Sequence, residues 1–163
     1  MSVYSSKLVW LLSALTVAPL VAVPESTPGK RDLPKCRQGM ILKETQDGLH
    51  MKSTATDPQL FFEHLPKGLR SPLELEVVMS SRMGNYGDVF WKGSKGGYAG
   101  QRRIRFPVPP DGKRRTYRVE LIGVGELKGI RFDPGPGPGE ATLHRLALIR
   151  PFGPPVELWS AGP

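Results

Sequence analysis

The densest positive charge in the sequence lies between residues 102 and 118. Arginine carries a planar fork of donors that binds carboxylate or sulfate groups through two parallel hydrogen bonds. Side-chain alternation along neighbouring strands would place Arg103, Arg105 and Arg118 on one exposed face, as a stripe that could grip such groups. The alternative is a solvated face whose charge only keeps the chain soluble. The basic residues of this run are Arg102, Arg103, Arg105, Lys113, Arg114, Arg115 and Arg118.

Three aspartates, Asp57, Asp88 and Asp133, could in principle supply paired carboxylates for acid–base chemistry. Each of them begins or ends an expected strand at a turn, where Asp commonly bonds to local backbone. The sequence contains no Gly-x-Ser-x-Gly elbow and no phosphate-binding loop. We therefore predict no catalytic residue. We also predict no metal site, because metal-ligand spacing is absent among the three histidines, His50, His64 and His144.

Short apolar runs recur about every ten residues from Gly39 onward, separated by turn signals, which indicates an all-β domain. In the run 73–80 the residues Leu73, Leu75 and Val77 share one face and Glu74 shares the other, so the strand has one wet side. Several such strands predict an antiparallel β-sandwich of two sheets. The expected strands are Met40 to Glu44, Leu49 to Ser53, Gln59 to Glu63, Leu73 to Ser80, Asp88 to Lys92, Arg102 to Val108, Thr116 to Leu121, Lys128 to Asp133 and Thr142 to Ile149.

Prolines mark two further features of this expected sandwich. Pro107 lacks an amide hydrogen, so its strand should lie at a sheet edge or end there. Ile130 and Phe132 should face the core, and Pro134 should end their strand. The Gly-Pro run that follows, 135–139, has little strand or helix propensity, and we expect it to form an exposed crossing between the two sheets.

The first 23 residues differ from the rest of the chain. A positive start, Met1 to Lys7, precedes sixteen uncharged residues, Leu8 to Val23, which is typical of a secretory signal cleaved near Ala22 or Val23. A retained membrane anchor is the alternative, although Pro19 interrupts the run. We expect a signal peptide over 1–23, a linker over 24–38, the sandwich over 39–152 and a tail over 153–163. The location would be secreted, periplasmic or cell-envelope.

The composition limits the kind of partner. Removal of the signal leaves 22 basic and 15 acidic residues, a net charge of +7. This charge favours acidic partners such as an anionic polysaccharide or an envelope surface, and export argues against nucleic acid. Cys36 is the sole cysteine, so no internal disulfide can form and burial must hold the fold.

The order of motifs over residues 47–150 resembles the galactose-binding-like, carbohydrate-binding jelly-roll modules found beside sulfatases, glycoside hydrolases and glycosyltransferases. A Thr-x-x-Asp-Pro step at 54–58 follows the first matching strand. The resemblance implies jelly-roll topology and non-catalytic binding of carbohydrate. The matching segments are DGLHMKSTATDPQLFFEHLP, SPLELEVVMSS, DVFWKG, IRFPVPPDGKRRTYRVEL and LKGIRFDPGPGPGEATLHRLALI.

One segment departs from the pattern of these modules. They often carry an aspartate in an Ile-Asp-x-Ile final strand, which can serve a structural calcium. This chain has Leu143-His144-Arg145-Leu146 there, and an imidazole beside a guanidinium removes an oxygen ligand and adds repulsion. We therefore expect no metal at this place and no cofactor.

Aromatic residues complete the candidate site. Flat rings pack against the apolar side of a sugar, and Trp91, Tyr86 and Tyr98 lie close together in sequence. Trp91 could instead belong to the core, because large aromatic residues often do. We take as the candidate ligand-binding set Tyr86, Trp91, Tyr98, Arg102, Arg103, Arg105 and Arg118.

The sequence thus predicts an exported, non-catalytic β-sandwich that binds carbohydrate, with anionic polysaccharide as one candidate, and is not integral to a membrane once the signal is removed. One alternative is a structural or protein-interaction domain of the envelope. A minor alternative is a jelly-roll polysaccharide lyase, because FWKGSKGGY, residues 90–98, loosely resembles a strand motif of those enzymes. Their Arg-Thr-Glu-Leu and Gln-Ile-His segments are absent.

Overall fold

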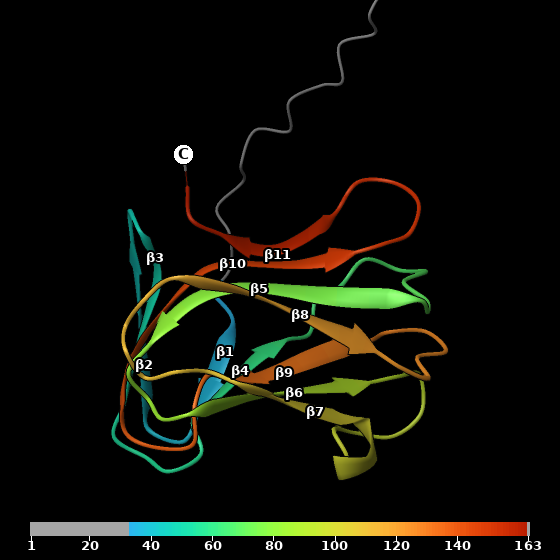
Figure 1. The fold of residues 1–163 in the computed structure, drawn as a ribbon. Coiled ribbons are helices and arrows are strands. Elements are labelled where there is room, and N and C mark those ends of the chain that lie inside the picture. The colour runs from blue at the N-terminus through green and yellow to red at the C-terminus, as the bar shows by residue number, and fades with distance from the viewer. Residues whose placement is uncertain (1–32, 163) are drawn as a thin grey trace, which may run out of the picture. The chain divides into compact units, whose positions relative to one another are not determined.

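The computed structural model describes residues 33–162, so the predicted signal segment lies outside the described residues. Figure 1 shows two antiparallel sheets stacked face to face. The five-stranded sheet has the order β1 (Lys35–Arg37), β4 (Gln59–Phe62), β9 (Gly129–Asp133), β6 (Tyr86–Lys92) and β7 (Arg103–Pro107). The six-stranded sheet has the order β2 (Met40–Thr45), β3 (Gly48–Ser53), β10 (Gly139–Ile149), β5 (Leu73–Ser81) and β8 (Arg115–Leu121), with β11 (Val156–Ser160) paired to β10.

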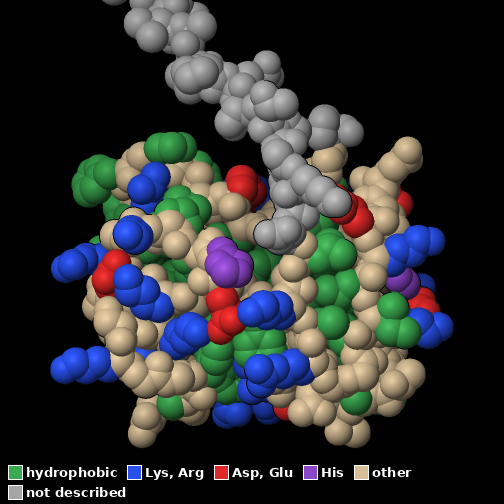
Figure 2. Space-filling view, turned by 180° about the vertical axis from the view of Figure 1, so that it is seen from behind, with side chains coloured by type: hydrophobic (Ala, Val, Ile, Leu, Met, Phe, Trp, Pro, Cys, Tyr) green, Lys and Arg blue, Asp and Glu red, His purple; other side chains and the backbone are tan. Residues whose placement is uncertain are grey.

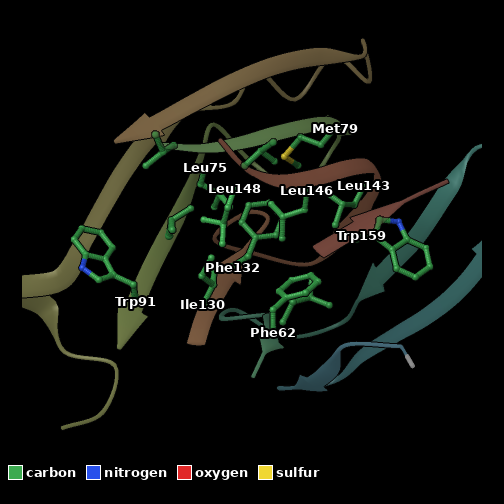
Figure 3. Packing of buried hydrophobic residues seen from close by; sticks show 14 of the residues in the cluster. Phe62, Leu75, Met79, Trp91, Ile130, Phe132, Leu143, Leu146, Leu148 and Trp159 are labelled. Carbon is green, nitrogen blue, oxygen red and sulfur yellow. The ribbon is translucent and has the colours of Figure 1, made fainter. Parts of the chain in front are cut away.

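The core lies between the two sheets, as period-two alternation requires. Figure 3 shows Ile130 and Phe132 of β9 pointing toward Leu75 of β5 and Leu146 and Leu148 of β10. All five side chains are fully buried. The prediction of an all-β antiparallel sandwich of two sheets is therefore confirmed.

All nine expected strands form, and two more lie outside the expected sandwich. β1 falls inside the predicted linker, and β11 falls inside the predicted tail, where Trp159 is 1% exposed. The strands of the two sheets therefore run from 35 to 160, beyond the expected bounds 39–152. β1 is too short to show alternation of apolar and polar residues. β11 follows a loop rich in Pro and Gly, so the sequence around it was interpreted as an irregular tail.

The proline predictions are confirmed in part. β7, which contains Pro107, is an edge strand of its sheet. Residues 134–138 do cross from β9 in one sheet to β10 in the other. The crossing is not fully exposed, however, because Pro134 and Gly135 are buried. A Cβ on Gly135 would lie 2.5 Å from the Cβ of Met83, so glycine permits this close contact with the β5–β6 turn.

Among residues 33–162 there is no helix long and apolar enough to cross a membrane. The helical element in this part of the chain is η1, a single 3₁₀ turn at Gly100–Arg102 that leads into β7.

Candidate functional site

The outer face of the five-stranded sheet carries two rows of side chains that run across the strands. The first row crosses β4, β9, β6 and β7 in that order, and each of its residues is paired with the next one on the neighbouring strand. Its members are Phe61, Arg131, Phe90 and Arg103. Side chains that are directly opposite on neighbouring strands lie about 5 Å apart, so cationic and aromatic groups alternate in contact. Lys35 of β1 extends this row opposite Phe61.

The second row lies one pleat further along the same face. It brings Asp133 of β9 opposite Asp88 of β6, and Asp88 opposite Arg105 of β7. Two carboxylates thus meet side by side on adjacent strands. Residues of both rows line a depression of about 250 Å³ on this face, which we call the pocket. The pocket is lined by Thr56, Asp57, Tyr86, Asp88, Phe90, Arg103, Arg105, Arg131, Asp133, Gly135 and Pro136.

Asp88 is buried and holds Arg105 through both carboxylate oxygens. Nε of Arg105 donates to Oδ1 at 3.1 Å and Nη2 donates to Oδ2 at 2.9 Å. The side chain of Asp88 is only 8% exposed, whereas that of Arg105 is 48% exposed. The guanidinium carbon also lies 3.7 Å from the ring centroid of Tyr86. The buried carboxylate therefore fixes the arginine in one orientation over the ring.

Asp133 holds Arg131 in the same way. Nε donates to Oδ1 at 2.8 Å and Nη2 donates to Oδ2 at 2.6 Å, and Nη2 also donates to Asp57 at 3.1 Å. Burial raises the pKa of Asp133, the hydrogen bonds and charge of Arg131 oppose this rise, and the carboxylates of Asp57 and Asp88 add to it, so that the resulting pKa is about 6. Asp133 therefore titrates in the mildly acidic range.

Arg103 differs from the other two arginines of the pocket. It is exposed, and its guanidinium carbon lies 5.9 Å from the ring centroid of Phe90, against 4.5 Å for Arg131 on the same ring. Over residues 33–162, Arg103 forms no ion pair or hydrogen bond with any side chain. Its donors and charge are therefore open to solvent.

The predicted site residues divide between the pocket and other places. Tyr86, Arg103 and Arg105 line the pocket. Trp91 does not, because it is 3% exposed and packs in the core, so its predicted role as a stacking surface is wrong. Figure 3 shows its ring directed inward from β6. The outward residues of β6 alternate with Trp91, which places Phe90 rather than Trp91 on the outer face.

Tyr98, Arg102 and Arg118 also lie away from the pocket lining. Tyr98 packs edge-on against Phe61 at 5.5 Å between ring centroids, and burial of its hydroxyl raises the pKa of the phenol. Arg102 donates to the backbone oxygen of Lys95 at 3.4 Å. Arg118 is on β8 of the other sheet and donates to Glu76 at 3.0 Å. The predicted stripe of Arg118 with Arg103 and Arg105 is therefore wrong.

Charge on the surface is distributed rather than gathered into one stripe. On the face drawn in Figure 2, Lys and Arg side chains spread over much of the left half and centre, and acidic side chains lie between them. On the six-stranded sheet Glu76 is 9% exposed in its side chain and pairs with both Arg118 and Arg145. Many of the basic residues thus stabilise the fold through ion pairs.

The sequence reasoning missed Phe90 and Arg131, and it assigned Asp57, Asp88 and Asp133 to separate turns. The alternation of inward and outward side chains along the two strands could have identified these residues. Val89 and Ile130 face the core, so their neighbours Asp88, Phe90 and Arg131 must face outward. Within residues 33–162 no group of three or more His, Cys, Asp or Glu side chains is arranged to hold a metal ion.

The two stacked antiparallel sheets form a β-sandwich with the fold of solved carbohydrate-binding modules, so the fold implied by the sequence resemblance is confirmed. The C-terminal family 6 carbohydrate-binding module of LamC, a marine laminarinase from Zobellia galactanivorans, is similar to this chain with a TM-score of 0.50 and 8% identity. The match covers 72% of this chain and 93% of that one. At this identity the likeness establishes the fold alone.

A second module of the same kind also aligns with the chain. It is the carbohydrate-binding module from Cellvibrio mixtus lichenase 5A, solved in complex with cellotriose, at a TM-score of 0.47 and 17% identity. The alignment covers 74% of this chain and 100% of that module. No protein-family model and no curated protein matches the chain.

Proposed function

We propose that this protein is a non-catalytic carbohydrate-binding module whose ligand lies on the outer face of the five-stranded sheet. The observation that carries the proposal is the polar pocket at Tyr86, Asp88, Arg105, Arg131 and Asp133, placed on a sandwich with the fold of carbohydrate-binding modules. Sugar hydroxyls need both donors and acceptors, and the guanidinium and carboxylate groups of this pocket supply both.

The pocket groups are held in place before a ligand arrives. Bidentate pairs orient Arg105 and Arg131, and the two aspartates that hold them are buried in the sheet. A site whose side chains are already ordered loses less conformational entropy on binding, which favours affinity. The contact surface for a sugar ring would be Tyr86 and Phe90 together with the stacked guanidinium groups.

The same geometry supports binding rather than catalysis. Both oxygens of Asp88 accept from Arg105, and both oxygens of Asp133 accept from Arg131. A general acid or base must reach a proton on the substrate within hydrogen-bond distance. Carboxylates that are buried and engaged at both oxygens are poorly placed for this role.

Export and an acidic ligand are further parts of the proposal. The charged start and apolar run at 1–23 have the order of a secretory signal, and an exported module would meet extracellular or envelope polysaccharide. The net charge of the chain, +8 with the leader included, favours an acidic glycan over a neutral one.

The test is retention of the purified protein in native gels that contain polysaccharide, with Tyr86→Ala as the site variant. Loss of one ring contact should lower the affinity about fivefold, since aromatic contacts contribute about 1 kcal/mol beyond their area. Phe152→Ala is the matched control, because Phe152 is 90% exposed and lies outside the pocket lining. Wild-type retention by both variants would contradict the proposed site, and no retention on any polysaccharide would contradict the function.

A further inference from the structure

Three guanidinium groups converge on the pocket from two strands. Arg103 and Arg105 point to the same side of β7, two residues apart, and Arg131 comes from β9 on the far side of β6. Arg103 and Arg131 both approach the ring of Phe90, with guanidinium carbons 5.9 Å and 4.5 Å from its centroid. Because both guanidinium groups lie near the ring of Phe90, a single ligand group bound there could contact both.

What a ligand would meet at this pocket is mainly cationic. The carboxylates of Asp88 and Asp133 are 8% and 7% exposed, whereas Arg103 is exposed, Arg105 is 48% exposed and Arg131 is 18% exposed. Arg105 and Arg131 use Nε and Nη2 for their aspartates, so these carboxylates leave the Nη1 edges unoccupied. Asp57, at 56% exposure, is the accessible carboxylate of the lining and is bonded to Arg131.

Arg103 supplies charge that no protein group in the described chain neutralises. Its neighbours across the strand and along it are Phe90 and Arg105, and it has no carboxylate within ion-pair distance among residues 33–162. An unpaired guanidinium next to two oriented ones suits an oxyanion with several acceptor oxygens, because the free fork of Arg103 can donate two parallel hydrogen bonds and the Nη1 groups of Arg105 and Arg131 are not used by their aspartates.

We infer that the pocket is an oxyanion subsite that takes a carboxylate or sulfate group carried on a sugar ring, with Arg103 as the residue that discriminates acidic from neutral glycans. This inference rests on the proposed carbohydrate-binding function and names the ligand class within it. The ring that bears the anion would lie over Phe90 and Tyr86, and its acidic group would lie among Arg103, Arg105 and Arg131.

The experiment compares matched acidic and neutral polysaccharides on the purified full chain. Polygalacturonate is set against its methyl ester, and dextran sulfate against dextran, with Kd measured by calorimetry at physiological salt. We expect binding to the acidic member of at least one pair to be about tenfold or more tighter than to its neutral counterpart, as one charge-assisted hydrogen bond provides. The pair that responds identifies carboxylate or sulfate as the source.

Arg103→Gln is the decisive variant, and Arg114→Gln is its charge-matched control. Arg114 is exposed in the β7–β8 loop and does not line the pocket. Arg103→Gln should weaken acidic binding about tenfold and leave any neutral binding unchanged, whereas Arg114→Gln should change it less than about twofold. Both side chains are exposed, and an unchanged melting temperature for each variant confirms that the fold is intact.

The outcomes separate this inference from the function on which it rests. Equal loss in Arg103→Gln and Arg114→Gln would mean attraction by overall charge, and it would overturn the subsite. The oxyanion subsite would also be overturned if acidic and neutral polysaccharides bound with equal Kd and Arg103→Gln did not change that Kd. The proposed carbohydrate binding would stand in that case. If none of the four polysaccharides binds and no other polysaccharide retains the protein in native gels, both the oxyanion subsite and the proposed carbohydrate-binding function are wrong.

Discussion

Asp133 should make the stability of the protein depend on pH in a direction opposite to that of most carboxyl groups. Its pKa is about 6 in the folded protein, because burial and the carboxylates of Asp57 and Asp88 outweigh Arg131. In an unfolded chain an aspartate titrates near 3.9. Between about pH 4 and pH 6 the folded state therefore binds more protons than the unfolded state, and the free energy of unfolding falls as the pH rises.

The size of this effect follows from the two pKa values. One pKa unit corresponds to about 1.4 kcal/mol, so a difference of about two units contributes at most about 3 kcal/mol between pH 4 and pH 7. Asp133→Asn removes this titration. The free energy of unfolding of the wild type, minus that of the variant, should therefore decrease by up to about 3 kcal/mol over this range. Titrating groups that do not interact with Asp133 cancel in this difference.

Urea unfolding at several pH values between 4 and 7, followed by the fluorescence of the buried Trp91 and Trp159, measures this difference. Asp47→Asn is the control for loss of an aspartate outside the pocket lining, because Asp47 lies at an exposed turn. If the Asp133→Asn difference does not change with pH, Arg131 keeps the carboxyl ionised throughout and the account of the pocket's electrostatics is wrong.

Two further predictions test packing at and beneath the pocket. Gly135→Ala places a Cβ 2.5 Å from the Cβ of Met83 and 2.8 Å from its backbone oxygen, so it should lower the free energy of unfolding by about 1–3 kcal/mol. Gly137→Ala is the control, because a Cβ there meets open space, and in the same urea assay it should change the free energy of unfolding by less than about 0.5 kcal/mol. Trp91→Ala should cost about 3–5 kcal/mol as a core truncation, and Tyr86→Ala should cost much less while weakening glycan retention; the reverse ranking of melting temperatures would contradict the assigned positions.

The fold was largely predictable because its strands are long enough to show which face is buried. The run 73–81 alternates with a wet side and a dry side, and the structure buries its dry side. β1 has three residues and β11 has five, and both are flanked by residues that favour turns, so no periodic pattern identified them. The close approach of Gly135 to Met83 depends on where two distant turns meet, which local propensity does not encode.

The site was less predictable because it depends on strand order and register rather than on neighbours in sequence. Arg118 and Arg105 look alike in sequence, since each alternates with apolar residues, but the order of strands sends one to each sheet. Asp88 and Asp133 were expected to have separate turn roles, because each lies at one end of an expected strand, but in the structure Asp88 lies inside β6.

Register is what converts these separate residues into a pocket. A side-chain period of two means that a slip of one residue between β6 and β9 would turn Asp88 or Asp133 to the other face, into the core. The buried apolar residues oppose this slip, because it would turn either Val89 and Trp91 of β6 or Ile130 and Phe132 of β9 out of the core. The apolar residues therefore specify the position of the charged ones, and Trp91 contributes to the pocket indirectly, by fixing the face on which Phe90 and its two arginines lie.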